Sequence, residues 1–153
     1  MYTFKLQAVL DHRQFLEDKL NKSFAEIKQQ VLSAQHQLAR LEQKEMDTAN
    51  ALKAEQAQGI SSEQVIAYHA YLRRLADHIV IQNKIIDALR RKEEEEREKL
   101  LAAMKKRKIL EKLKDQGLEK YNQALFKSEM KFIDEIAVNQ FARRTINSNG
   151  GGE

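Results

Sequence analysis

Apolar residues recur along the first third of the chain at alternating spacings of three and four. Two interleaved series show this pattern, and ten of their fourteen positions are apolar. The series are Leu10, Glu17, Phe24, Val31, Leu38, Glu45 and Leu52, and Leu6, Arg13, Leu20, Ile27, Ala34, Leu41 and Thr48. A heptad of this kind produces a narrow apolar seam that fits one partner helix rather than a broad globular core. It predicts a helix over about residues 4–57.

One strong internal turn signal follows, at residues 58–61. Gly59 suits the position just after a helix, where the backbone is often left-handed and glycine has no Cβ to clash. Ser61, with Gln64 three residues later, has the pattern of a capping box that opens a new helix. We therefore expect a second helix from about residue 62. Gly117 has no capping residue after it, so we expect it to weaken or bend a continuing helix rather than end one.

The second helix begins with the same heptad. Its first eight seam positions are Val65, Tyr68, Leu72, Leu75, Ile79, Gln82, Ile86 and Leu89, and all of them except Gln82 are apolar. The apolar pattern then fails at Glu93 and Glu96. It returns at Leu100, Met104, Leu110 and Leu113. We interpret this stretch as a continuous helix with a local shift of phase.

A turn at Gly59 folds the two arms back on each other, so that residue i lies opposite roughly residue 119 − i. The fold class we predict is all-α, with two long helices forming an antiparallel coiled-coil hairpin. The second helix reaches about residue 144 and is longer than the first. We expect residues 1–146 to form a single domain and residues 147–153 a disordered tail.

The part of the second helix beyond the first arm, from about residue 118 to residue 144, is not polar. Four of the ten aromatic residues lie in it, and two more lie near the N-terminus, at the same end of the predicted hairpin. An exposed apolar helix usually marks a surface for a partner. The candidate residues are Tyr2, Phe4, Tyr121, Phe126, Phe132, Ile133, Ile136 and Phe141.

Composition favours long helices and gives little support to catalysis. Proline and cysteine are absent, and one-third of the residues are charged. Without cysteine there are no disulfides or thiol nucleophiles, and no apolar run approaches the roughly 20 residues of a membrane-spanning helix. The four histidines do not share the spacing of metal ligands. We expect no catalytic, cofactor-binding or metal-binding residues, and no small-molecule substrate.

A basic cluster lies between residues 105 and 114, where six cations face one acidic residue, Glu111. The cations are Lys105, Lys106, Arg107, Lys108, Lys112 and Lys114. Such a cluster can bind nucleic acid by neutralising phosphates. The net charge of the whole chain is only +4, which favours an acidic protein surface as the electrostatic partner. A basic coiled coil that binds nucleic acid is the alternative function of a different class.

Taken together, these features resemble the FliJ family, the coiled-coil component of the bacterial flagellar type III export apparatus. The resemblance covers the chain to about Arg144. It is carried by the length of the first helix, the Gly59–Ile60 turn with its serine-rich cap, and Tyr68 and Tyr71 early in the second helix. It is also carried by the stretch SEMKFIDE, residues 128–135, whose acidic and basic positions match the C-terminal signature of the family.

The resemblance implies a non-catalytic stalk, similar in fold to the central stalk of rotary ATPases. Its open end would bind the hexameric flagellar export ATPase and promote assembly of the ring. It would also contact the cytoplasmic domain of the membrane export gate and handle export chaperones. The implied location is the cytoplasmic face of the inner membrane, reached through protein partners. An equivalent stalk of a virulence type III secretion system is a second candidate.

Alignment on the turn places the gate-binding surface of the family near the turn-proximal third of the hairpin. The matching positions are Gln37, Leu41, Tyr71 and Leu75. The heptad places Leu41 and Leu75 in the seam, where we expect them to be buried. The two lines of reasoning therefore disagree about these two residues.

Overall fold

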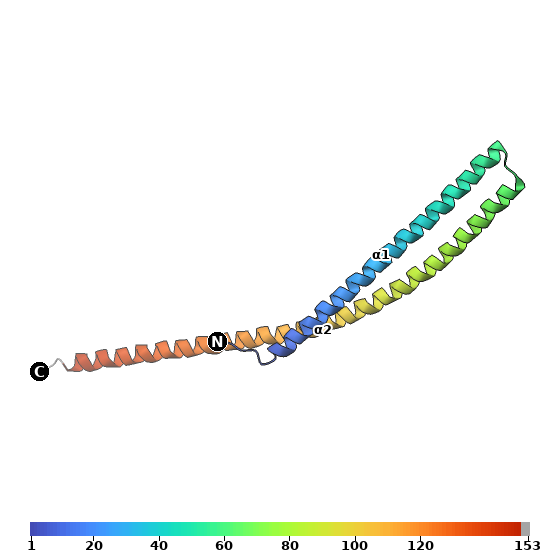
Figure 1. Cartoon of the computed structure of the whole chain (residues 1–153). Coiled ribbons are helices and arrows are strands. Elements are labelled where there is room, and N and C mark those ends of the chain that lie inside the picture. The colour runs from blue at the N-terminus through green and yellow to red at the C-terminus, as the bar shows by residue number, and fades with distance from the viewer. Residues whose placement is uncertain (151–153) are drawn as a thin grey trace. The chain divides into compact units, whose positions relative to one another are not determined.

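The computed structural model describes residues 1–150 and contains two helices in that range. Helix α1 spans Gln7–Gln58 and helix α2 spans Ser62–Asn149 (Figure 1). No strand occurs among the described residues. The predicted all-α class, with a second helix longer than the first, is confirmed.

The helix ends differ from the predicted ones by a few residues. Helix α1 begins at Gln7 rather than at residue 4, and α2 continues past residue 144 to Asn149. Residues 147–149 of the predicted disordered tail are therefore helical, and residues 151–153 lie outside the described residues. In this last part of α2 the Thr145 and Ser148 hydroxyls each donate to a backbone carbonyl oxygen one turn earlier at 2.9 Å. The helix ends where the glycine-rich segment begins.

Contacts within the chain divide it into two units. One unit is Gln14–Met104, which contains the turn, and the other joins Met1–Arg13 to the chain from Lys105 onward. In the first unit the two helices run side by side in opposite directions from the turn (Figure 1). Whether residues 1–146 fold as a single domain stays a prediction.

The core of the Gln14–Met104 unit is the predicted seam. Its buried apolar residues are Val31, Ala34, Leu52, Leu75, Ile86 and Leu100. Glu17, at another predicted seam position, is buried as well. The Gln82 side-chain amide donates a hydrogen bond of 2.9 Å to the carbonyl oxygen of Ala34. Because 34 and 82 add up to 116, the observed register lies within three residues of the expected one.

The phase shift that we predicted after Leu89 does not occur. Glu93 and Glu96 are half-buried and Leu100 is buried, so the spacing of three and four continues through the stretch. Beyond Leu100 the half-buried positions are Ala103, Met104, Arg107, Leu110, Glu111, Lys114, Gly117 and Tyr121. Leu113, which the shifted phase placed in the seam, is 46% exposed. Apolar residues alone misled the prediction, because polar side chains occupy several seam positions here.

The turn has the predicted chemistry. Gly59 has a φ of 89°, in the left-handed region, and its N–H donates to the carbonyl oxygen of Gln56 at 3.2 Å. The Ser61 N–H donates to the Gln64 side-chain oxygen at 3.3 Å, and the Gln64 N–H donates to the Ser61 hydroxyl at 3.2 Å. This reciprocal pair is a capping box. It provides hydrogen-bond partners for two backbone N–H groups at the start of α2, where no preceding turn of the helix can supply a carbonyl oxygen.

A side-chain contact joins the helices close to the turn. The Glu55 carboxylate on α1 accepts a hydrogen bond from the Tyr68 hydroxyl on α2. This bond, together with burial and the negative charge of Glu55, raises the pKa of Tyr68 above its ordinary value of 10.0. The neutral phenol is favoured because it donates to the carboxylate, whereas a tyrosinate would repel it.

Replacing Gly59 should destabilise the hairpin. A Cβ at Gly59 meets no neighbouring atom within 4 Å, so the effect of Gly59→Ala comes from the left-handed backbone alone. We expect a loss of about 1–2 kcal/mol in the free energy of unfolding. Urea unfolding followed by circular dichroism measures it. An unchanged midpoint would show that another backbone conformation serves the turn equally well.

The Tyr68–Glu55 contact makes the hairpin sensitive to high pH. Because folding raises the pKa of Tyr68, its contribution is complete below pH 10.0 and is lost as the pH rises through the higher folded value. Ultraviolet titration of tyrosinate should show a late step that Tyr68→Phe removes and Glu55→Gln moves to lower pH. The matched control Tyr71→Phe should leave that step in place. A late step that survives Tyr68→Phe would contradict this assignment.

Candidate functional site

The C-terminal part of α2 is an exposed helix with large apolar side chains. Every described residue from 122 to 150 is exposed. Phe126 is 63% exposed, Phe132 64% and Phe141 72%. Within its unit no other segment runs beside this part of the helix, drawn in orange to red (Figure 1). Five predicted partner-binding residues are thus at the surface: Phe126, Phe132, Ile133, Ile136 and Phe141.

These apolar residues lie on more than one face of the helix. Phe126, Met130, Ile133 and Phe141 follow one another at helical spacing and form one stripe. A second stripe consists of Leu125, Phe132 and Ile136. At about 100° per residue, the first stripe is roughly opposite Tyr121, and the second is on the intervening side. A helix with apolar side chains around much of its circumference is typical of a buried position in a larger protein or assembly.

The other predicted partner-binding residues, Tyr2, Phe4 and Tyr121, contact the chain itself. Residues Met1–Leu6, which precede α1, form an N-terminal strap beside α2 (Figure 1). Tyr2 and Phe4 are half-buried, whereas Thr3 and Lys5 between and after them are exposed. The ring centroids of Tyr2 and Tyr121 are 5.8 Å apart at an interplanar angle of 44°, a favourable tilted arrangement. The amino group of Met1 also donates to the Tyr121 hydroxyl at 2.9 Å.

Gly117 gives Tyr2 its place against α2. A Cβ at this position would lie 3.1 Å from Cζ of Tyr2 and closer still to its hydroxyl oxygen. As expected from the sequence, Gly117 does not end the helix, since α2 is helical through it, and a weakening or bend there stays a prediction. Because glycine has no side chain, the Tyr2 ring can approach the backbone of α2 closely at this position. The spacing of residues in the sequence does not predict this role.

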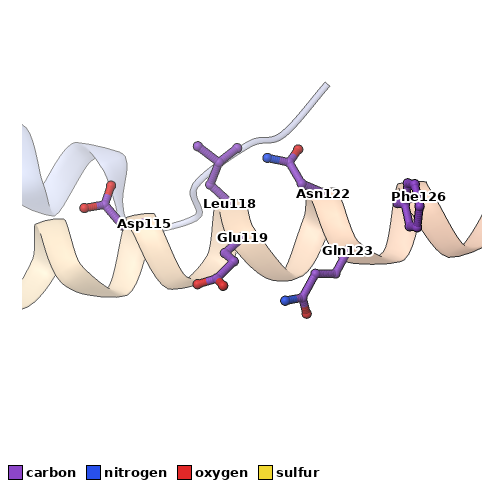
Figure 2. Close-up of a pocket in the computed structure, with 6 residues that line it drawn as sticks. All are labelled: Asp115, Leu118, Glu119, Asn122, Gln123 and Phe126. Carbon is purple, nitrogen blue, oxygen red and sulfur yellow. The ribbon is translucent and has the colours of Figure 1, made fainter.

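An open groove lies on the same stretch of α2 and was not foreseen. Asp115, Leu118, Glu119, Asn122, Gln123 and Phe126 line it (Figure 2). They come from successive turns of one helix and combine two carboxylates and two amides with apolar side chains. Of these residues only Phe126 was a candidate, because polar residues at helical spacing look like an ordinary solvated face.

The basic cluster is divided between exposed and half-buried cations. Lys105, Lys106, Lys108 and Lys112 are exposed, and Lys114 is half-buried. Arg107 forms an ion pair with Glu111 on the same helix, with Nη1 2.7 Å from Oε1. The four exposed lysines therefore present the positive charge of this surface.

The four residues of the turn-proximal surface differ in exposure. Gln37 and Tyr71 are exposed, Leu41 is half-buried, and Leu75 is only 4% exposed. The Arg74 guanidinium lies over the Tyr71 ring at 5.8 Å from the ring centroid. The heptad was right about Leu75, which packs in the seam and offers a partner almost no surface. Tyr71 lines a shallow groove with Glu55, Gln64, Ala67 and Tyr68.

Residues 1–150 hold no group of three or more histidine, aspartate or glutamate side chains placed to bind a metal ion. Neither helix has a stretch of 18 residues apolar enough to cross a membrane, as far as the described residues extend. The described surface carries aromatic and aliphatic stripes, exposed lysines and an amide-rich groove.

Comparison with known proteins identifies the family. The sequence matches the flagellar FliJ protein family over residues 2–145. A comparison with curated proteins and one with solved structures give no match. The match includes both helices, the turn and the exposed part of α2 up to Thr145. The chain belongs to the FliJ family and is a coiled-coil protein related to flagellar export.

Proposed function

We propose that this protein is a non-catalytic stalk of the flagellar type III export apparatus. Its exposed C-terminal helix binds the hexameric export ATPase and promotes assembly of the ring. Its turn-proximal surface contacts the cytoplasmic domain of the membrane export gate, and it escorts export chaperones. It acts at the cytoplasmic face of the inner membrane through these protein partners.

The observation that carries the proposal is the apolar character of α2 on two of its faces beyond residue 122. A partner that covered one face alone would leave large aromatic side chains in water. Burying such a side chain stabilises a complex by roughly 1.5–3 kcal/mol, so covering only one stripe would forgo much of the available energy. Protein on several sides of the helix, as in the centre of a ring, accounts for both stripes. The family membership supports the same partner.

Electrostatics supports a protein partner rather than nucleic acid. The exposed lysines of the basic cluster lie on α2 before the apolar stripes, and Glu111 already neutralises Arg107. They suit acidic loops at the rim of a ring, where complementary charge speeds association more than it adds affinity. The remaining cations make a small patch on a chain with a net charge of only +4.

The gate contact is proposed for the surface around Gln37 and Tyr71. Both side chains are exposed, and Tyr71 is an amphipathic aromatic of the type that often anchors interfaces. Leu75 and Leu41 pack in the seam beneath this surface, and we assign them no direct contact with the gate. Tyr71 is 38% exposed although Arg74 lies over its ring, so part of the ring is available to a partner.

Removing the exposed aromatic rings should abolish ATPase binding. The triple variant Phe126→Ala, Phe132→Ala and Phe141→Ala removes three rings that are more than 60% exposed and that α2 does not need for its own packing. We expect affinity for the export ATPase of the same organism to fall by on the order of a hundredfold or more. Mass photometry of ring assembly and the hydrolysis rate, measured in the same samples, should fall with it.

Phe15→Ala is the matched control, because Phe15 is 62% exposed but lies on α1 in the other unit. It should bind like the wild-type protein. Truncation before Phe126 should act like the triple variant and leave helical content per residue nearly unchanged. Wild-type affinity in either the triple variant or the truncated protein would refute the proposed stalk role.

The gate contact predicts a separate defect. Tyr71→Ala should lower affinity for the cytoplasmic domain of the export gate by roughly tenfold and leave ATPase binding intact. The unfolding midpoint should change little, since Tyr71 lies outside the buried seam. Isothermal titration calorimetry measures both affinities, with Ile66→Ala, also exposed and on α2, as the control. Unchanged gate binding in Tyr71→Ala would remove this surface from the proposal.

A further inference from the structure

We propose that the N-terminal strap, Met1–Leu6, is a latch that withholds Tyr2 and Tyr121 from the ATPase ring until the ring displaces it. This inference rests on the proposed function, since it concerns the regulation of the same binding surface. Gly117 is the residue that lets the latch close. The proposal assigns an autoinhibitory role to a contact that otherwise looks like simple packing.

The contact is specific in shape. Tyr2 lies against α2 at the one helical position in this stretch without a side chain, and any Cβ at Gly117 would overlap its hydroxyl group. The aromatic ring of Tyr2 then packs against Tyr121, four residues further along the same face of α2. Gly117 thus forms a notch in the surface of α2, and Tyr121, one turn away, forms a flat surface. Together they accommodate the single aromatic side chain of Tyr2.

The hold on the strap is weak enough to be released. The strap is not helical and adds no strand to a sheet. Its backbone carbonyls accept two hydrogen bonds from α1, from the Gln7 N–H to Phe4 at 3.1 Å and from the Leu10 N–H to Leu6 at 2.9 Å. On the α2 side the strap adds the bond from the Met1 amino group to the Tyr121 hydroxyl. Its half-buried side chains are the two aromatic rings of Tyr2 and Phe4, which alternate with exposed residues. Segments with few buried contacts and few backbone hydrogen bonds open at low free-energy cost.

Closing the latch removes aromatic surface from the partner-binding end of α2. Tyr2 and Tyr121 are half-buried against each other, whereas the apolar residues from Leu125 onward are exposed. A ring subunit that binds beyond Tyr121 meets exposed side chains first. It gains the two tyrosines only after Tyr2 leaves the notch. Apparent affinity is therefore lowered by the fraction of molecules in which the strap is closed.

The test is Gly117→Ala, whose Cβ takes the space of the Tyr2 hydroxyl, so that the Tyr2 ring must shift while both tyrosines are kept. The chain has no cysteine, so Thr3→Cys supplies a single exposed site for a nitroxide spin label on the strap. We expect the label to be restricted in the otherwise wild-type protein and mobile when Gly117→Ala is added. In the unlabelled protein, Gly117→Ala should tighten binding to the export ATPase roughly three- to tenfold.

Two controls separate the latch from other effects of the substitution. Gln116→Ala changes the neighbouring exposed position on α2 and should alter neither label mobility nor affinity. Tyr2→Ala combined with Gly117→Ala should free the label and lose the gain in affinity, because the released ring is no longer there to bind. Circular dichroism checks that α2 stays helical, as an alanine in place of a glycine favours.

Each result decides the matter. A label that stays restricted in Gly117→Ala overturns the latch geometry. A mobile label with unchanged or weaker affinity overturns the masking role, while the Phe126, Phe132 and Phe141 variant still tests the proposed function independently. If the wild-type protein and Gly117→Ala both fail to bind the ATPase, the proposed function and the masking role fall together. Mobility together with tighter binding supports the latch.

Discussion

The seam between α1 and α2 is the interaction on which the rest of the structure depends. Apolar residues spaced alternately by three and four give each helix just enough buried surface for one neighbour. Leu75 and Ile86 are each only 4% exposed in that seam, and neither helix has a second face of comparable burial. Where α2 has no neighbour it therefore has no internal way to bury apolar side chains. The aromatic residues beyond Tyr121 are consequently exposed.

The sequence was most informative where local chemistry decides structure. Gly59 and the Ser61–Gln64 pair were identifiable because a left-handed residue and a capping box depend on residues within one turn of each other. The heptad of α1 was equally readable, since most of its seam positions are apolar. The same approach gave the wrong seam in α2 at Glu93 and Glu96, because their carboxylates made the apolar pattern look interrupted. The backbone period continues there, because a half-buried glutamate can lay its methylene groups on the partner helix and keep its charge at the edge.

The candidate site could be predicted only in outline. That the C-terminal part of α2 is exposed followed from the unequal lengths of the helices, and the exposure of Phe126, Phe132 and Phe141 agrees with it. The packing of Tyr2 on Gly117 and Tyr121 could not be foreseen, because it joins positions about 115 residues apart through the shape of a missing side chain. The burial of Leu75 agrees with the heptad, whereas Leu41 is half-buried. Neighbouring positions of one helix can belong to the seam and to a binding surface.

Polar residues in the seam also have a mechanical consequence. In the Gln14–Met104 unit, Gln82 bonds the Ala34 carbonyl, and Glu93 and Glu96 occupy seam positions among apolar ones. An entirely apolar seam would look nearly the same after a shift of seven residues, about 10 Å along the axis. Here such a shift would break the Gln82 bond and bring carboxylates against different neighbours. The polar residues therefore fix the register of the two helices of this unit. A force applied along one helix is transmitted to the other, because the helices resist sliding past each other.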